Sequence, residues 1–229
     1  MHPSEPFPHF VDDYLAYLYE VLPTQASLDG VHLHDDLLED VSRAAIDTDV
    51  HTLSGFGRRL HQIDASALPP AQQVDHRIVG SHIESRMYEL ETIRTWDRNP
   101  QIYSDTLGMS LAAQALFAYS PEAERARRVV SKLRQVPRLV QAARENIKDT
   151  PGIFVKVGLE AWRGTLKFIE SDLPRAFSSL DDLHILGDLA DTSTEAAAAI
   201  SSYIEYLETD LAPGRRRRSD WAASASSGS

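Results

Sequence analysis

The sequence predicts an all-α protein, a bundle or array of about seven to eight helices with no substantial sheet. Three observations predict it. Apolar residues recur at every third or fourth position along most of the chain, which places them on one face of a helix. No alternating pattern of useful length indicates a strand. The chain has 229 residues, 42% of them hydrophobic and 25% charged, which suits one large globular domain or two small ones.

The first half of the chain carries three helical patterns. The first ends at Pro23, and its apolar positions are Phe7, Phe10, Val11, Tyr14, Leu15, Leu18 and Leu22. The turn-rich stretch SLDGVHLHDD precedes a second helix, predicted over about residues 42–63. Its inward residues are Leu53, Phe56, Leu60 and Ile63. A third helix follows, with the core stripe Val74, Ile78, Val79, Ile83, Met87, Leu90 and Ile93.

Prolines and capping residues mark the helices of the second half. Ser120–Pro121 indicates a cap and a first helical residue. Pro137 is expected to kink or restart that helix, and Thr150–Pro151 indicates another cap and start. The last helix is predicted to begin at Ser193 or Thr194. Its apolar residues are Ile200, Tyr203, Ile204 and Leu207.

The charge of the chain limits its partners. The net charge is −11, and Arg215–Arg218 with Asp220 contribute +3 of it, so residues 1–213 carry −14. Such an acidic body repels phosphate backbones and anionic lipid surfaces. We therefore expect neither nucleic acid nor a membrane as a partner.

The chain contains no cysteine, which excludes disulfides, thiolate metal sites and a cysteine nucleophile. The first ten residues, MHPSEPFPHF, have no basic segment followed by an apolar run, and no stretch reaches the length of a membrane span. These features predict a soluble, cytoplasmic protein.

Motifs that carry chemistry are mostly missing. A helical zinc peptidase needs two histidines four residues apart around a glutamate, and the nine histidines contain no such pair. The densest polar cluster is His32, His34, Asp35 and Asp36. Imidazole and carboxylate groups can ligate zinc or iron. Acidic residues also favour a helix N-terminus, and the sequence favours this second interpretation, a capped helix start.

The connection TWDRNPQIYSD, residues 95–105, is unusual because it combines two large aromatics with an Asp-Arg pair. Asn99-Pro100 indicates a helix stop. One interpretation is that Trp96 and Tyr103 fill the gap between helices. The other makes this connection a candidate site, with cleft or loop contacts from Trp96, Arg98, Asn99 and Tyr103.

Several segments together resemble one family. GVHLHDDLLEDVS, TWDRNPQIY, VPRLVQAARENIKDTPGIFVKVGLEAWRGTLKFIESDLP and YIEYLETDLAP resemble, in this order, the N-terminal part of the bacterial domain of unknown function 885 family. Residues 136–174 are the most specific part, and the resemblance ends after Pro213. The family pattern has a tyrosine where His34 stands, which weakens a metal role for the cluster.

Members of this family look like helical zinc-dependent metallopeptidases with a large cleft and a zinc motif in their C-terminal half. The resemblance implies that this chain is an N-terminal fragment without that motif, so no catalytic residue and no metal ligand is carried over. Zinc is expected only in a full-length member, and no cofactor in this chain. Residues 1–213 are the predicted helical domain, and residues 214–229, rich in Arg, Ser and Ala, are expected to be a disordered tail.

Two functions remain open at this point. The chain is a non-catalytic fragment or subunit of a metallopeptidase-like protein, truncated before the zinc motif, that binds peptide weakly or pairs with a C-terminal half. Alternatively, it is a stand-alone helical interaction module that pairs with another protein or with itself.

Overall fold

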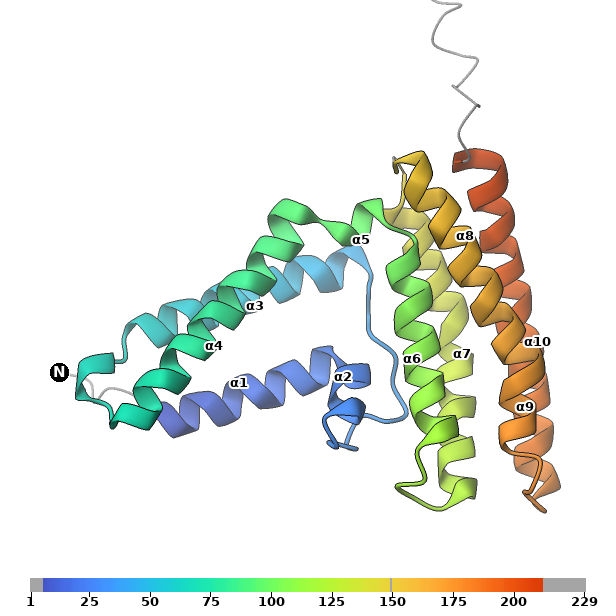
Figure 1. Cartoon of the computed structure of the whole chain (residues 1–229), viewed down its shortest axis with the longest axis horizontal. Helices are drawn as coiled ribbons and strands as arrows, with labels where there is room; N and C mark the ends of the chain where they lie inside the picture. Colours follow the sequence, from blue (N-terminus) through green and yellow to red (C-terminus); the bar gives the residue numbers. More distant parts are fainter. Residues whose placement is uncertain (1–5, 149, 212–229) are drawn as a thin grey trace, which may run out of the picture.

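The structure is a computed structural model that describes residues 6–148 and 150–211. This part of the chain contains helices, turns and connecting segments but no strand, which confirms the predicted all-α class. Eight of its α-helices have six residues or more, and the other two, α5 (Thr95–Arg98) and α9 (Leu173–Ala176), have four. Figure 1 shows that the helices form two arms that join near α5.

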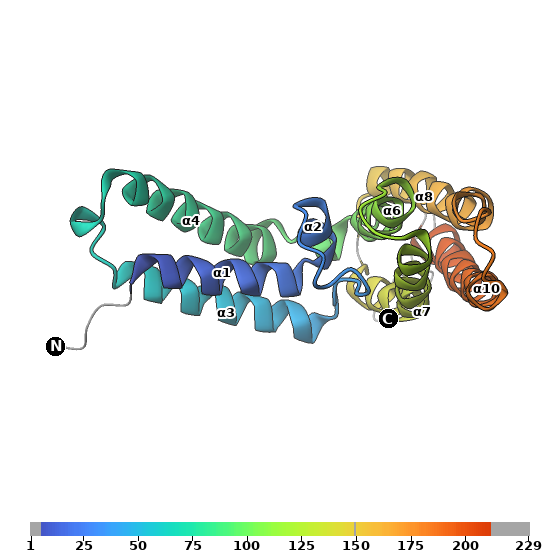
Figure 2. The ribbon, with the colours of Figure 1, turned by 90° about the horizontal axis from the view of Figure 1, so that it is seen from below.

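The N-terminal arm contains α1 (Phe7–Val21), α3 (Arg43–His61) and α4 (Pro70–Tyr88), which lie side by side in both ribbon views (Figures 1 and 2). Ser42 caps α3, because its side-chain oxygen accepts a hydrogen bond from the Ala45 N–H at 3.2 Å. The 3₁₀ turn η1 (Ala65–Ala67) connects α3 to α4. The arm encloses its own core, which consists of Phe7, Phe10, Tyr14, Leu18, Leu53, Phe56, Leu60, Ile63 and Ile83.

The stripe predicted on the third helix is only partly buried. Ile83 is buried and Val79 packs against the core, but Val74 is 45% and Ile78 is 61% exposed. The helix also changes at its end into the π-helical turn η2 (Glu89–Ile93), which shifts the positions of the following side chains around the axis. Val74 and Ile78 precede this turn, so α4 itself carries apolar side chains on a second face, outside the core of its arm.

The C-terminal arm is a bundle of α6 (Gln101–Leu116), α7 (Glu122–Asn146), α8 (Gly152–Lys167) and α10 (Leu183–Tyr206). Figure 2 shows these helices nearly end-on, while the helices of the N-terminal arm lie across the view. Two π-helical turns, η3 (Phe168–Asp172) and η4 (Leu207–Leu211), extend α8 and α10. The largest fully buried apolar side chains of this core are Trp162, Tyr103, Tyr203, Phe177, Leu107, Leu111 and Leu133.

Several predicted helix boundaries were wrong. The N-cap position of α7 is Pro121 rather than Ser120, and α7 continues through Pro137 without restarting. The α8 helix begins at Gly152 after Pro151. The last helix begins at Leu183, ten residues before Ser193, because the Asp182 carboxylate accepts hydrogen bonds from the backbone N–H groups of His184 and Ile185.

A crossover segment joins the two arms before α3. Pro23 ends α1 and also begins the short helix α2 (Pro23–Leu28), and residues 29–42 then run beside α6 and α7 toward the start of α3 (Figure 1). The Gln135 side chain on α7 holds this segment, accepting a hydrogen bond from the Leu38 N–H at 3.0 Å and donating one to the Asp36 carbonyl at 2.8 Å. The crossover therefore packs on the C-terminal arm, although the helix that follows it in sequence, α3, belongs to the N-terminal arm.

The predicted tail, residues 214–229, lies outside the described residues. The same holds for the last two residues of the predicted domain 1–213. Across the part of the chain that is described, no helix combines the length and the apolar character that crossing a membrane requires.

Candidate functional site

An apolar groove lies in the angle between the two arms. Its volume is about 620 Å³, and side chains of α1, α2, α4 and α6 line it. Leu15 and Leu28 enter from α1 and α2, Ile78 from α4 and Met109 from α6. These four side chains are 39%, 41%, 61% and 51% exposed, respectively. The second apolar face of α4 therefore borders a concave surface that water reaches.

The polar groups of the groove are mostly engaged with one another. The Tyr14 hydroxyl lies 2.7 Å from His82 Nδ1, and burial followed by the nearby Arg86 charge lowers the pKa of His82. The buried Glu39 carboxylate accepts hydrogen bonds from the Thr24 N–H and hydroxyl, both at 2.9 Å, at the first turn of α2. A ligand in this groove would thus meet apolar side chains and polar groups that already have partners.

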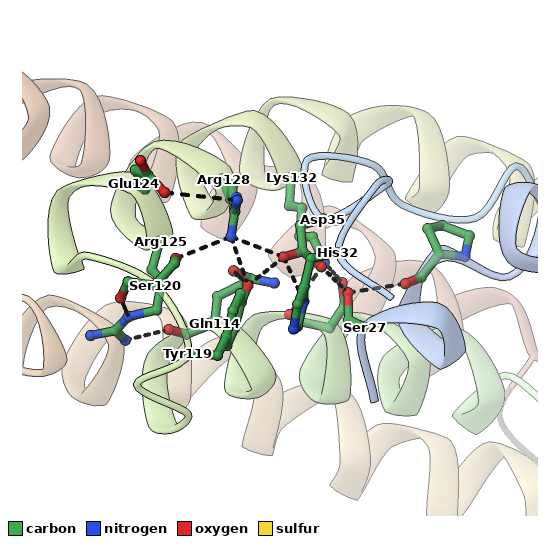
Figure 3. Close-up of polar contacts among 12 residues, drawn as sticks. Ser27, His32, Asp35, Gln114, Tyr119, Ser120, Glu124, Arg125, Arg128 and Lys132 are labelled. Carbon is green, nitrogen blue, oxygen red and sulfur yellow. Dashed lines mark hydrogen bonds and ion pairs between the residues drawn. The ribbon is translucent and has the colours of Figure 1, made fainter. Parts of the chain in front are cut away.

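Outside the groove, the crossover is held by a buried carboxylate, Asp35, whose side chain is 1% exposed. Figure 3 shows its polar contacts. Its Oδ1 accepts a hydrogen bond from the Ser27 hydroxyl. Its Oδ2 lies 3.1 Å from His32 Nδ1, 2.5 Å from the Tyr119 hydroxyl and 3.0 Å from Arg128 Nη1. Burial acts to raise the pKa of Asp35, but the hydrogen bonds from Ser27, Tyr119 and His32 outweigh it and lower the pKa.

The partners of Asp35 also contact each other. The His32 ring stacks on the Tyr119 ring, with centroids 3.8 Å apart and planes 4° apart. The Arg128 guanidinium lies 5.5 Å from the centre of the Tyr119 ring and donates a hydrogen bond to the Ser120 hydroxyl at 3.1 Å. The network therefore links the crossover to α7 and to the connection between α6 and α7.

Lys132 lies deeper in the same region and is fully buried. Its ammonium donates a hydrogen bond to the Ser110 hydroxyl at 2.6 Å. Burial lowers the pKa of Lys132 to about 8, although the charges of Glu39, Asp35 and Asp36 act against this shift. Water does not reach this serine and lysine, so they pack α6 against α7 and are not open to a substrate.

The cluster His32, His34, Asp35 and Asp36 does not form a helix start, which corrects the sequence interpretation. Residues 33–36 make a turn, and an extended segment follows. The cluster does not fit a metal either: both Asp35 oxygens are already occupied by hydrogen-bond donors and by Arg128. Throughout residues 6–148 and 150–211, no three His, Asp or Glu side chains gather in a way that would hold a metal ion.

The four candidate residues of the 95–105 connection lie close together in the fold but play different parts. The connection contains the short helix α5 rather than only a loop. Trp96 is buried, and its indole N–H donates to the Leu90 carbonyl at 2.9 Å. The buried Tyr103 hydroxyl donates to the Trp96 carbonyl, and Asn99 Oδ1 accepts from the Gln101 N–H at 3.1 Å. Arg98 is 57% exposed.

Sequence reasoning missed the groove and the network around Asp35. Both are made of residues distant along the chain: Arg128 is 93 residues from Asp35, and Ile78 and Met109 belong to different arms. For the groove, the available signal was Ile78, which extends the apolar stripe of α4 beyond what one narrow core contact needs.

The fold and the groove define a class: an all-α protein of two helical arms with an apolar groove between them. The chain belongs to the bacterial family of proteins of unknown function DUF885, whose model matches residues 23–226. This match extends past Pro213, where the sequence resemblance was expected to end. None of the curated proteins matches the chain.

A solved structure shares the fold. It is described as "a putative lipoprotein of unknown function" from Shewanella oneidensis, with 19% sequence identity and a TM-score of 0.80. The match covers 89% of this chain but 37% of the Shewanella protein. This chain therefore spans little more than a third of the length of that structural neighbour, and the similarity concerns the fold alone.

Proposed function

We propose that this chain is the non-catalytic helical part of a metallopeptidase-like protein, and that its apolar groove receives a polypeptide segment. One observation supports this proposal above the others. Four large apolar side chains from four different helices converge on a concave surface and stay partly exposed. A contiguous apolar surface of this kind is typical of an interaction site.

The comparison with the Shewanella protein supports the same proposal. This chain matches 37% of that protein, so most of the Shewanella protein lies outside the matched region. The sequence resemblance implies a zinc motif in the C-terminal half of family members. A C-terminal half, encoded separately or present in a longer relative, would supply the segment that fills the groove and any catalytic groups.

The charge of the groove favours a basic segment. The charged side chains that line it are the carboxylates of Asp29 and Glu39, and no Lys or Arg of the described residues is among them. The whole chain has a net charge of −11. We therefore propose an amphipathic helix as the occupant, with leucine-like side chains in the groove and basic side chains at its rim.

Binding of a synthetic helix tests the proposal. The probe is a fluorescent 15-residue peptide with leucines at helical spacing and lysines elsewhere, and its control replaces the lysines with glutamates. The basic peptide should bind more tightly, and Ile78→Asp or Met109→Asp should weaken its binding about tenfold. Leu183→Asp is the matched control, because Leu183 is 82% exposed and lies outside the groove. Equal affinity in all these chains would refute the proposal.

The alternative function, a self-pairing interaction module, would use the same apolar surface for a second copy of the chain. Sedimentation velocity separates the two. A monomer that binds the basic peptide supports the proposed part of a larger protein. A specific dimer that persists on dilution and dissociates in the Met109→Asp chain would support the self-pairing module instead.

A further inference from the structure

A second concave site lies at the corner where the two arms meet, and it shares no residue with the apolar groove. Its volume is about 470 Å³. The start of α3, the turn and short helix around α5 and the end of α7 line it together. Its lining residues are Arg43, Arg94, Trp96, Asp97, Arg98, Glu145, Asn146 and Lys148.

The pocket is cationic in an otherwise acidic chain. Four of its side chains are basic and two are acidic, whereas the whole chain carries −11. Asp97 pairs with Arg94 at 2.5 Å, and Glu145 accepts a hydrogen bond from Gln141 at 2.6 Å. Each carboxylate therefore has one partner within the protein, while Asp97 Oδ1 has no hydrogen-bond partner among the described residues and lies 3.6 Å from Arg98 Nε.

Two of the four cations are paired less closely than the others. Arg43 pairs with Asp47 at 3.0 Å and Arg94 pairs with Asp97, so both are largely neutralised. Arg98 Nε lies 3.6 Å from Asp97, too far for a strong hydrogen bond, and its side chain is 57% exposed. Lys148 donates a hydrogen bond to a neutral group, the Arg144 carbonyl, at 3.0 Å, and no ion pair joins it to a carboxylate of the described residues.

Cation–π contacts hold the wall of the pocket at Trp96. The guanidinium groups of Arg43 and Arg94 lie 4.7 and 5.0 Å from the centre of the Trp96 ring. Arg94 has a φ of 55°, and among the described residues it is the only one other than glycine with a positive φ. This left-handed conformation costs roughly 1 kcal/mol or more and turns the chain sharply from η2 into α5. Such local strain is common where a side chain must be placed for binding.

We propose that this pocket binds the phosphate group of a small ligand. A tetrahedral, doubly charged group can accept hydrogen bonds from Arg98 and Lys148 at once, whereas a carboxylate is planar and singly charged. The pocket is larger than a phosphate ion, so the rest of the ligand would lie against the Trp96 edge of the site. This assignment does not depend on what the apolar groove binds.

Thermal unfolding with inorganic phosphate tests the proposal. At constant ionic strength, 10 mM phosphate should raise the Tm by roughly 3 °C if the Kd is about 1 mM, whereas the same concentration of acetate should not. The double variant Arg98→Gln with Lys148→Gln should lose this rise. Circular dichroism and the Tm without phosphate would establish that the variant is folded.

The matched control changes two exposed cations elsewhere, Arg175→Gln with Lys156→Gln, and so removes the same charge. This control should keep the phosphate-dependent rise in Tm. An equal rise in both double variants would show that phosphate acts on the whole surface and would overturn the proposal. A rise with acetate as large as that with phosphate would overturn the assignment of a phosphate group.

Discussion

Asp35 and Arg128 lie 93 residues apart in the chain, yet their charged atoms are 3.0 Å apart in the structure. Four side chains surround the Asp35 carboxylate, and its own side chain is 1% exposed. A buried carboxylate with these partners stabilises the fold mainly while it is charged, because a neutral group would leave Arg128 with only the more distant and exposed Glu124 carboxylate, 3.9 Å away. At the residue scale this contact fixes the crossover to the C-terminal arm.

The substitution Asp35→Asn should therefore destabilise the fold by about 2–4 kcal/mol. The pKa of Asp35 is lower in the folded state than in the unfolded chain, so its contribution is present above the unfolded pKa and is lost as the pH falls through the folded pKa. Urea unfolding at pH 7 and at pH 3 should show that the free energy of unfolding falls less on acidification in the variant than in the unmodified chain. Asp47→Asn, which removes an exposed partner of Arg43, should cost less than about 0.5 kcal/mol. Equal costs for both variants would contradict this role.

Lys132 predicts a second rise of stability with pH, in the alkaline range. Its folded pKa is about 8, below the ordinary value of 10.5, mainly because of burial. Between these two values the unfolded chain holds more protons, so stability should rise with pH, by about 1.5 kcal/mol from pH 8 to pH 9.5. Lys132→Met should abolish the rise, and Lys156→Met, at an exposed position, should keep it. Tyrosines with a raised pKa act against this rise as the pH approaches 10, so the measured quantity is the difference in slope between the unmodified chain and Lys132→Met. Equal slopes in these two chains would contradict a buried charged lysine.

At the scale of the helices, the close contact between α8 and the start of α6 requires a glycine, Gly158. A Cβ atom at Gly158 would lie 2.6 Å from Pro100 Cγ and 3.4 Å from the Gln101 backbone N. Four residues further along α8, the Trp162 indole N–H donates to the Pro100 carbonyl at 3.0 Å. The helices pack closely here, so any side chain at this position must displace the chain at Pro100.

We predict that Gly158→Ala destabilises the protein by about 2 kcal/mol, because the added methyl group overpacks this contact. Gly164 lies on the same helix with nothing within 4 Å of a Cβ atom, so Gly164→Ala should stabilise the protein by about 0.5–1 kcal/mol. Urea unfolding of the two variants measures both effects. A stabilising Gly158→Ala would show that α8 and α6 are not in close contact.

Sequence patterns predicted most helices but not the features that depend on contacts between residues distant in sequence. The stripes of α1 and α3 were recognised because each buries one regular face. The start of α10 was missed because Gly187, Thr192 and Ser193 interrupt the apolar pattern, although the Asp182 cap was visible in the sequence. The left-handed Arg94 has no sequence signal, because positive φ is expected of glycine.

At the scale of the whole molecule, the two arms form separate cores joined by α5 and by the crossover. The candidate residues Trp96, Arg98, Asn99 and Tyr103 all lie at this junction, and of them Trp96 and Arg98 line its cationic pocket. Their proximity was predictable because they are neighbours in sequence. The groove could not be predicted, because it depends on the angle between the two arms, and the sequence pattern within each arm does not indicate that angle.

The purified chain should bind no stoichiometric zinc. The oxygens of Asp35 already have partners, and no group of three His, Asp or Glu side chains gathers in the described part of the chain. Elemental analysis after dialysis against a weak chelator measures this directly. One tightly bound zinc ion per chain would contradict the prediction.

Photo-crosslinking most directly tests whether the groove binds a polypeptide. A photoreactive phenylalanine analogue would replace Met109 in one chain and Leu183 in another, and each would be irradiated with the basic amphipathic peptide. Met109 lines the groove between the arms and is 51% exposed, whereas Leu183 is more exposed, at 82%, and lies outside it. We expect crosslinks from position 109, removed by an excess of unlabelled peptide, and few from position 183. Crosslinking from position 183 at or above the level from position 109 would contradict the proposed function.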